Sequence, residues 1–392
     1  MIISKPTTSA QTPMSHTKVL RAPPEFPESA LPAHVHKLAR PVALQKATQL
    51  AFLRFDKADL DEAQRFWTDF GLITVSRTAD KLVMRGAGSA PAILMASKAK
   101  VSRYVGAAFV VPPDTDFERL QRDSGARPLA AHVVPGGARG VSLLDPDGNE
   151  VWLITDWGTV DPLPLREPKH PHMNALGQTP RVNATVRTDI EAATVGRLGH
   201  VVMQTTDFHT MADWYMRQLG VIPSDVQYLD DGAPFLTFFR LDLGNTPADH
   251  HTVVIAGGLE ACYEHSAWEV NDLDALGQGQ QVLRVNGHDH MWGIGRHLLG
   301  SQLFDYWRDA DGYAFEHYTD GDVFTADREP HYGPFTTSAL WAWGHDVPAS
   351  MFPAKTPAML WRVIKLLRSG RVTLKRLLMM GRVVDTPARP WK

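Results

Sequence analysis

Residues 195–221 read VGRLGHVVMQTTDFHTMADWYMRQLGV, and the same layout occurs earlier in the chain in LQKATQLAFLRFDKADLDEAQRFWTDFGL, residues 44–72. In each stretch an apolar segment leads into an Asp, a helical pattern with an aromatic pair, and a Gly stop. Asp is favoured at helix N-caps and Gly at helix C-caps, so each stretch predicts a strand followed by a helix. The aromatic pairs and the stops are Phe66-Trp67 with Gly71 and Trp214-Tyr215 with Gly220.

Two more pairs of segments match in the same order. GAAFVVPPDTDFERL, residues 106–120, parallels HSAWEVNDLDALGQG, residues 265–279. VSLLDPDGNEVWLI, residues 141–154, parallels FDYWRDADGYAFEH, residues 304–317. Three ordered matches indicate an internal duplication. Each half is predicted to contain strand, helix and several strands twice, which gives four βαβββ units in two tandem α+β domains.

Composition excludes several classes of protein. The 392 residues carry a net charge of −3, which gives no electrostatic sign of a nucleic-acid binder. A single cysteine, Cys262, cannot form a disulfide within the chain, and we expect a cytoplasmic protein. No apolar run reaches the ~18 residues of a membrane span.

Composition also predicts where the domains begin and end. Residues 1–42 are rich in Pro, Ser and Thr and are expected to form a loose N-terminal arm. We expect domains at 43–157 and 196–328, a Pro-rich linker at 158–195 and an extension at 329–392. The extension ends in a basic amphipathic stretch broken by Gly370. Packing on the second domain is favoured for this stretch over a contact in a homo-oligomer or on a membrane surface.

Comparison of the two halves isolates three polar residues. The segment from Tyr313 to Tyr318 is predicted to be a half-buried strand, on which Glu316 shares a face with Ala314 and Tyr318. Such a carboxylate needs a partner. Two histidines and one carboxylate are the set that non-haem Fe(II) enzymes use, because it leaves coordination positions open. The three residues and their counterparts in the first half are Glu316 with Trp152, His265 with Gly106, and His200 with Ala51 or Phe52.

Residues 295–322, GRHLLGSQLFDYWRDADGYAFEHYTDGD, resemble the signature of the type I extradiol ring-cleaving dioxygenases of the vicinal oxygen chelate superfamily. LGHVV around His200 and EHSAWEVNDLDAL around His265 are similar to the segments that hold that family's ligand histidines. The resemblance extends from about Leu44 to Phe324. It implies two tandem vicinal oxygen chelate domains, each a curled mixed sheet around a central funnel, with the metal only in the second.

The resemblance also implies a reaction and a set of site residues. A catechol-type substrate would be cleaved with incorporation of both atoms of O2 on Fe(II), with Mn(II) as the alternative metal. The metal ligands would be His200, His265 and Glu316. His297 and Tyr306 would lie next to the metal ligands without binding the metal. His251, rather than its neighbour His250, would be the general acid or base. The catalytic set would therefore be His251, His297 and Tyr306.

Two residues depart from the family pattern. Ala310 stands where the pattern has Pro, and Asp305 stands where an apolar or aromatic residue is usual. The second change is expected to alter the wall of the substrate pocket. We expect an apolar pocket because four aromatic residues lie near the ligands in the sequence. They are Trp268, Trp292, Phe304 and Trp307.

Other clusters carry weaker expectations. His288 and His290 are expected on a solvated turn, and KHPHM at 169–173 is expected to be exposed. Cys262 is expected to be a small core residue rather than a nucleophile. Two alternative functions stay open: a metal-free ligand-binding protein, and a non-dioxygenase enzyme of the same superfamily. Bound iron together with oxygen uptake on a catechol separates both from the leading prediction.

Overall fold

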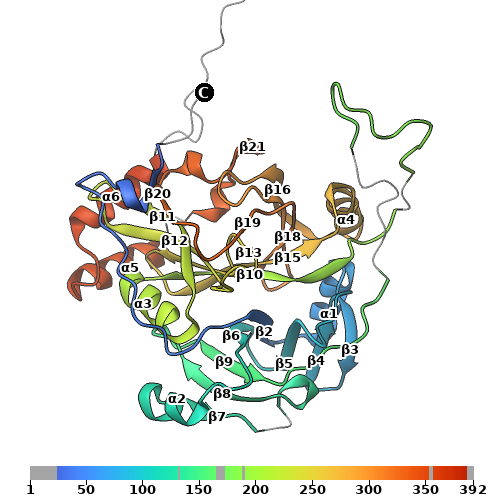
Figure 1. The fold of residues 1–392 in the computed structure, drawn as a ribbon, viewed down its shortest axis with the longest axis horizontal. Coiled ribbons are helices and arrows are strands. Elements are labelled where there is room, and N and C mark those ends of the chain that lie inside the picture. The colour runs from blue at the N-terminus through green and yellow to red at the C-terminus, as the bar shows by residue number, and fades with distance from the viewer. Residues whose placement is uncertain (1–23, 131–132, 165–172, 188–189, 353–355, 386–392) are drawn as a thin grey trace, which may run out of the picture.

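The structure is a computed structural model that describes residues 24–130, 133–164, 173–187, 190–352 and 356–385. Two large mixed sheets dominate it, one from each half of the chain (Figure 1). In chain order both halves repeat strand, helix and several strands, as the duplication predicts.

The first sheet has the strand order β3-β4-β5-β2-β6-β9-β8-β7. Its two βαβββ units lie side by side and meet where β2 pairs with β6. The elements of the first unit are β2 (Gln49–Lys57), α1 (Leu60–Asp69), β3 (Ile73–Arg77), β4 (Lys81–Arg85) and β5 (Leu94–Lys98). Those of the second are β6 (Arg103–Val110), α2 (Phe117–Ser124), β7 (Arg127–Pro128), β8 (Arg139–Leu144) and β9 (Glu150–Thr155).

The second sheet repeats this order, with β10 paired to β15 at its centre. The third unit contains β10 (Val195–Thr205), α3 (Phe208–Leu219), β11 (Ile222–Tyr228), β12 (Pro234–Arg240), β13 (Ala248–Asp249) and β14 (Val253–Gly257). The fourth contains β15 (Cys262–Val270), α4 (Leu273–Val285), β16 (Asp289–Arg296), β17 (Leu303–Arg308) and β18 (Ala314–Thr319). A short β19 (Val323–Phe324) pairs with β13.

Each helix of the four units begins after an Asp whose side chain accepts a hydrogen bond from a backbone N–H of the first turn. These N-caps satisfy donors that a helix start otherwise leaves unpaired. They recur in all four units, which is why the duplication could be read from the sequence. The N-cap residues are Asp59, Asp116, Asp207 and Asp272.

The halves pack together through α1 and α3, which lie at their boundary in Figure 1. Phe70 of α1's C-terminus stacks on His317 of β18 with ring centroids 3.7 Å apart, and Phe66 contacts Phe315. β18 is therefore buried on both faces, so the prediction of a half-buried strand is wrong. A helix from the other half covers the face that sequence reasoning assigned to solvent.

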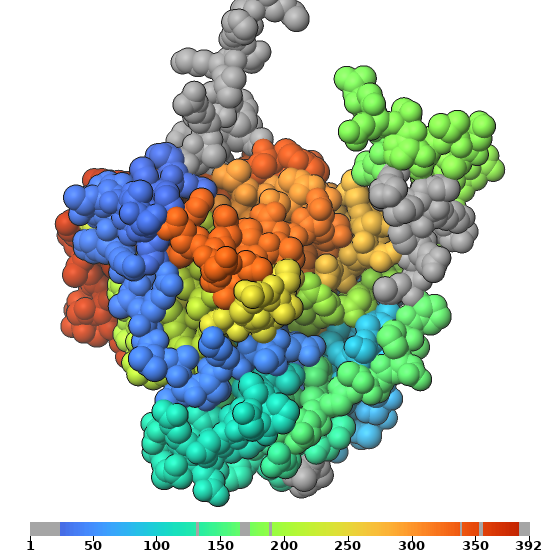
Figure 2. Space-filling model, viewed as in Figure 1, coloured from blue at the N-terminus to red at the C-terminus, as the bar shows by residue number. Residues whose placement is uncertain are grey.

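The described residues before β2 and after β19 also pack on the second half. β1 (Phe26–Pro27) pairs with β20 (His331–Pro334), and Val35 and Leu38 are buried, so residues 24–42 are not the loose arm expected. In Figure 2 this blue segment runs across one side of the molecule. β20 in turn adds to the sheet beside β11.

The rest of the extension contains β21 (Trp343–Gly344), α5 (Pro357–Arg368) and α6 (Leu374–Asp385). The break between the helices includes Gly370, as predicted, and Leu366 of α5 and Met379 of α6 are buried. Among the described residues no helix is long and apolar enough to cross a bilayer. Short 3-10 helices complete the structure at Glu28–Ala30, Pro135–Gly137, Thr337–Ala339 and Ala349–Met351.

Candidate metal centre

His200, His265 and Glu316 meet in the second sheet, on three adjacent strands. Their ligand atoms all lie within 4.8 Å of one another, and all three residues are buried. Pairing across the sheet explains this: Ala267 of β15 lies opposite His200 of β10 on one side and opposite Glu316 of β18 on the other. His265 is two residues from Ala267, so strand alternation places it on the same face. Both histidines lie within their strands.

The donor set fits a cation. Glu316 is fully buried, and neither carboxylate oxygen has a hydrogen-bonding partner among the described residues. Burial raises the pKa of Glu316, but the nearby imidazoles of His200, His265 and His297 outweigh it and lower the pKa well below its usual value. Burial lowers the pKa of His200. Burial also acts to lower the pKa of His265, but its hydrogen bonds with Glu264 and Glu316 raise it to about 9. A metal ion would displace that proton, because ligand histidines bind metals in the neutral form. One carboxylate and two imidazoles are a common set of ligands for a divalent transition metal.

The described residues of the first half hold no such set. In the first sheet, Ala108 lies opposite Phe52 on one neighbouring strand and opposite Trp152 on the other. Ala267 occupies the same position between His200 and Glu316 in the second sheet. The counterpart of His200 is therefore Phe52 and not Ala51. At Gly106, a Cβ would lie 1.8 Å from the carbonyl oxygen of Glu150, so no side chain fits there. Aromatic rings from Phe52, Trp152 and Trp157 fill the space that is the metal centre in the second half.

His251 is the member of the His250–His251 pair that points toward the centre. Its Nε2 lies 3.3 Å from Nε2 of His200. Burial lowers the pKa of His251 well below its usual value, and the positive forms of His200 and His250 would lower it further. A buried imidazole that stays neutral can accept a proton from a bound group.

His297 and Tyr306 lie on the other side of Glu316. His297 Nδ1 is 2.7 Å from the carbonyl oxygen of Leu340, which can only accept, so this nitrogen carries the hydrogen. In neutral His297, Nε2 then accepts a hydrogen bond from the Tyr306 hydroxyl at 3.0 Å. The same Nε2 lies 3.4 Å from Glu316 Oε1. Burial raises the pKa of Tyr306 well above its usual value, so the phenol keeps its proton.

The expectation that Asp305 alters the pocket wall is wrong. Asp305 precedes Tyr306 on β17 and therefore faces the opposite side of the sheet, toward α4. There it is fully buried and binds His290, Gln280 and the indole N–H of Trp307.

The four aromatic residues expected near the pocket divide between the two faces of the sheet. Trp292 lies beside Tyr306, and Phe304 stacks on His297 with ring centroids 4.1 Å apart. Trp268 stacks on Phe315 on the other face, toward the first half, with centroids 6.0 Å apart. Trp307 lies against His290 on that same face. Only Trp292 and Phe304 are placed to form a wall near the ligands.

The minor clusters have structural explanations. His288 binds Asp69 of the first half at 2.8 Å, so His288 and His290 pair with carboxylates and are not simply solvated. Cys262 is exposed, so the prediction of a small core residue is wrong. Partial burial of its thiol raises the pKa to about 12, which disfavours the reactive thiolate. Of the KHPHM segment, residues 169–172 lie outside the described residues.

Sequence reasoning missed several groups that support the centre. Glu264 accepts from His265 Nδ1 at 2.7 Å, and such a partner orients a ligand imidazole so that its other nitrogen faces the metal. In the sequence, the only sign of this role of Glu264 was its position directly before His265. The Leu340 carbonyl and Asp225 gave none, because they approach the site only through folding.

Comparison with known proteins agrees with this geometry. No protein-family model matches the chain. The chain is 30% identical over 294 residues to metapyrocatechase 2 of Cupriavidus necator, an alignment that covers 74% of this chain and 87% of that protein. Among solved structures, a Mn(II)-bound glyoxalase from Novosphingobium aromaticivorans (20% identity, TM-score 0.65) covers 80% of this chain and 96% of its own.

An extradiol ring-cleaving dioxygenase from B. fuscum has 18% identity and a TM-score of 0.65, covering 81% of this chain and 85% of its own. BphC, a halotolerant catechol dioxygenase, has 16% identity and a TM-score of 0.60. At such identities these structures establish the fold, whereas the metapyrocatechase match establishes the family. With its centre in the second of two duplicated halves, the chain belongs to the type I extradiol ring-cleaving dioxygenases of the vicinal oxygen chelate superfamily.

Proposed function

We propose that this dioxygenase binds Fe(II) through His200, His265 and Glu316 and opens the ring of a catechol-type substrate with O2. The observation that carries the proposal is the convergence of these three buried ligands in a chain of this family. Bound Fe(II) would supply open coordination positions for the substrate and for O2 and a path for electrons between them. Both oxygen atoms enter the product, four electrons come from the ring, and no outside reductant is needed.

The chain's own residues would handle protons. A catechol must lose protons as it binds a metal, and His251 Nε2 is placed to accept one because it faces the ligand His200 at 3.3 Å. Tyr306 remains a phenol and can donate a hydrogen bond to a substrate oxygen. His297 orients the Tyr306 hydroxyl through the hydrogen bond at its Nε2. These three form the proposed catalytic set.

The wall beside this set favours an aromatic substrate. Trp292 and Phe304 present ring surfaces next to Tyr306 and His297. Offset or edge-on contact with a substrate ring would contribute about 1 kcal/mol beyond the area buried. The substrate class is therefore a catechol whose remaining ring atoms are largely apolar.

The test is anaerobic loading of the purified chain with Fe(II), followed by oxygen uptake and visible absorbance against a panel of catechols. The expected result is one O2 consumed for each coloured, ring-opened product. Glu316→Ala should lose both bound iron and turnover. Glu150→Gln is the matched control, because it changes a carboxylate on β9, the strand of the first half that corresponds to β18, and it should keep both.

Absence of oxygen uptake with every catechol, in protein that holds iron, would contradict the proposal. Full activity with Mn(II) and none with Fe(II) would change the metal but not the ligands. A Mn(II)-bound glyoxalase with the same fold makes that control necessary.

We also propose that the chain acts as a cytoplasmic homo-oligomer. One cysteine and no possible internal disulfide support the compartment. Leu360, Trp361, Leu374 and Leu378 on α5 and α6 are exposed, and burial against a second copy would remove this apolar surface from water. Light scattering on the full chain, with and without residues 356–392, tests the assembly.

A further inference from the structure

A row of three side chains leads away from the metal centre. His251 faces His200, His251 Nδ1 lies 2.9 Å from Nδ1 of His250, and His250 Nε2 lies 2.5 Å from a carboxylate oxygen of Asp225. Both imidazoles are buried, with 3% and 1% of their surfaces exposed. Neither His250 nor Asp225 is among the metal ligands or the proposed catalytic set, so the row needs an explanation of its own.

The donor and the acceptor of each hydrogen bond in the row follow from the chemistry of the three side chains. A carboxylate has no proton to donate, so His250 must donate to Asp225 from Nε2. The other ring nitrogen of neutral His250, Nδ1, can then only accept. His251 must therefore donate from its own Nδ1, which leaves a lone pair on its Nε2. That lone pair points at the metal centre.

We propose that Asp225 and His250 are positioning residues that fix the tautomer and the orientation of His251, so that its unprotonated Nε2 faces the substrate. The inference rests on the proposed function, because it assigns the row to proton acceptance in that reaction. Neither residue touches the substrate or the metal. Each acts through the next ring, as a carboxylate does when it selects the tautomer of a catalytic histidine.

The surroundings of His250 hold the row rigidly. Its backbone N–H donates to the carbonyl of Asp322 at 2.8 Å. Gly300 lies against the ring: its φ is +78°, and a Cβ there would lie 3.0 Å from His250 Nδ1. Rings from Phe238 and Phe324 flank the imidazole. With backbone and rings on several sides, His250 has little room to rotate away from His251.

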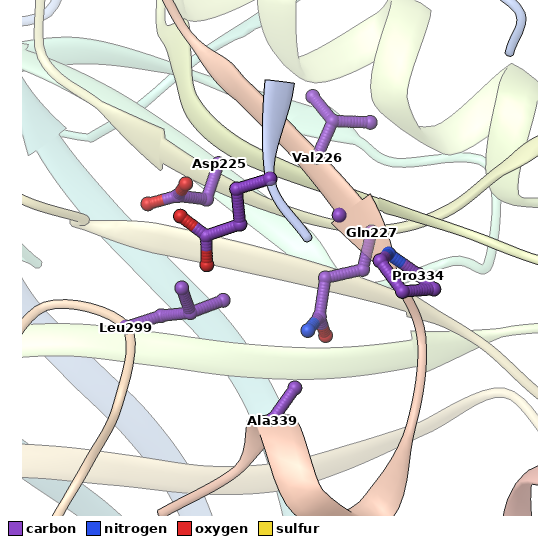
Figure 3. Close-up of a pocket in the computed structure, with 8 residues that line it drawn as sticks. Asp225, Val226, Gln227, Leu299, Pro334 and Ala339 are labelled. Atoms are coloured by element: carbon purple, nitrogen blue, oxygen red, sulfur yellow. The ribbon is translucent and has the colours of Figure 1, made fainter. Parts of the chain in front are cut away.

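Asp225 lies at the outer end of the row, on β11. A small cavity borders its side chain, lined also by Glu25, Gln227, Leu299 and Ala339 (Figure 3). Burial raises the pKa of Glu25, and the charge of Asp225 raises it further. Asp225 is the carboxylate of this pair that contacts His250 Nε2, which is consistent with its role as the acceptor.

The first test compares Asp225→Asn with Asp225→Glu in the Fe(II)-loaded enzyme. The amide of Asn can donate as well as accept, so the tautomer of His250 is no longer fixed, and we expect kcat to fall by about 10–100-fold with iron content unchanged. Glu restores an anionic acceptor and should recover most of the loss. The matched control is Asp230→Asn, an exposed Asp just beyond β11, which should behave as wild type.

Anaerobic binding of 4-nitrocatechol adds a spectroscopic signature, because its absorption reports how many protons its hydroxyls have lost. We expect a less fully ionised ligand in Asp225→Asn and in His250→Phe than in wild type. A purely structural role would lower the amount of folded protein but would leave the spectrum of the bound ligand unchanged. Wild-type kcat and spectrum in both variants would overturn the proposal.

The second test does not depend on turnover. In the full chain labelled with 15N-histidine and loaded with Zn(II), long-range correlation spectra identify the protonated nitrogen of each ring. We expect His251 to be protonated at Nδ1 and His250 at Nε2, and Asp225→Asn to give a mixture. His251 protonated at Nε2 in the wild type would refute the inference. If no catechol is cleaved but the tautomers are as stated, the proposed function fails and the positioning stands.

Discussion

At the scale of single residues, one carboxylate decides how the site is understood. Glu316 is fully buried, with both oxygens lacking hydrogen-bonding partners among the described residues, yet three imidazole rings lower its pKa. A buried anion without a counter-charge is costly, so the position is stable only with a cation or with protonated histidines beside it. A metal ion supplies the positive charge that Glu316 needs without protonation of the neighbouring histidines.

Metal binding should therefore stabilise the fold. At an Fe(II) concentration about 100 times the dissociation constant, the stabilisation is about 2.7 kcal/mol, which corresponds to a rise in Tm of about 3 °C for a chain of this length. Anaerobic calorimetry with and without Fe(II) measures it. Glu316→Ala should show no such rise, and an equal rise in that variant would mean that iron binds elsewhere.

Cys262 should react slowly with thiol reagents although it is exposed. Partial burial raises the pKa of its thiol to about 12, and the carboxylates of Glu260 and Glu264 add to the rise. The thiolate is the reactive form, so alkylation at pH 8 should be at least about tenfold slower than that of free cysteine. Because the thiolate fraction increases with pH below the pKa, the rate should rise about tenfold from pH 8 to pH 9. Mass spectrometry after timed labelling checks this, and a pH-independent rate would contradict it.

At the scale of elements, β17 and β18 each serve two different functions on their two faces. Tyr306 and Glu316 lie opposite each other on the face toward the metal centre, while Asp305 and His317 lie opposite each other on the face toward the interior. Because successive side chains of a strand point to opposite faces, the residues near the metal centre are separated from those that pack in the interior.

This separation predicts opposite phenotypes for neighbouring substitutions. Tyr306→Phe should lower kcat by about 10–100-fold and change the free energy of unfolding by less than about 1 kcal/mol. Asp305→Ala should cost about 3 kcal/mol of stability, because it leaves His290 and the Trp307 indole without their buried acceptor. Activity per bound iron should stay near the wild-type value in Asp305→Ala. Denaturant titration and steady-state kinetics on both variants test this prediction. Loss of stability in Tyr306→Phe together with loss of kcat in Asp305→Ala would show that the faces are assigned wrongly.

At the scale of the whole molecule, a buried ion pair joins the first half to the turn that precedes the strand of Glu316. Lys57 of β2 is fully buried and forms ion pairs with Asp309 and, at 2.9 Å, with Asp311. Both aspartates belong to the turn between β17 and β18, which positions Glu316. The first half thus holds the turn that precedes the metal-binding strand.

Removing this contact should be costly. Lys57→Met leaves the Asp309 carboxylate buried without its cation, and we expect a loss of about 3–5 kcal/mol in the free energy of unfolding. Adding Asp309→Asn should recover part of it, since the orphaned charge is then gone. Chemical denaturation of the two variants and of Asp309→Asn alone completes the cycle. Equal stability of Lys57→Met and wild type would mean that the pair contributes nothing.

The sequence by itself determined what is local or repeated. Asp before each helix, Gly after α3 and the turn residues before β9 and β18 act within a few residues, so they predicted four βαβββ units. Comparison of the halves isolated His200, His265 and Glu316, because a fold-determined residue should recur in both copies and these do not.

Only the tertiary structure decided what depends on contacts between distant segments. It buried both faces of β18, turned Asp305 away from the pocket, and brought Asp225 and the carbonyl of Leu340 to the rings that flank the metal centre. Strand alternation specifies two faces, but which neighbour covers each face depends on how the halves pack. Contacts of this kind are set by the burial of whole elements, which no short stretch of sequence encodes.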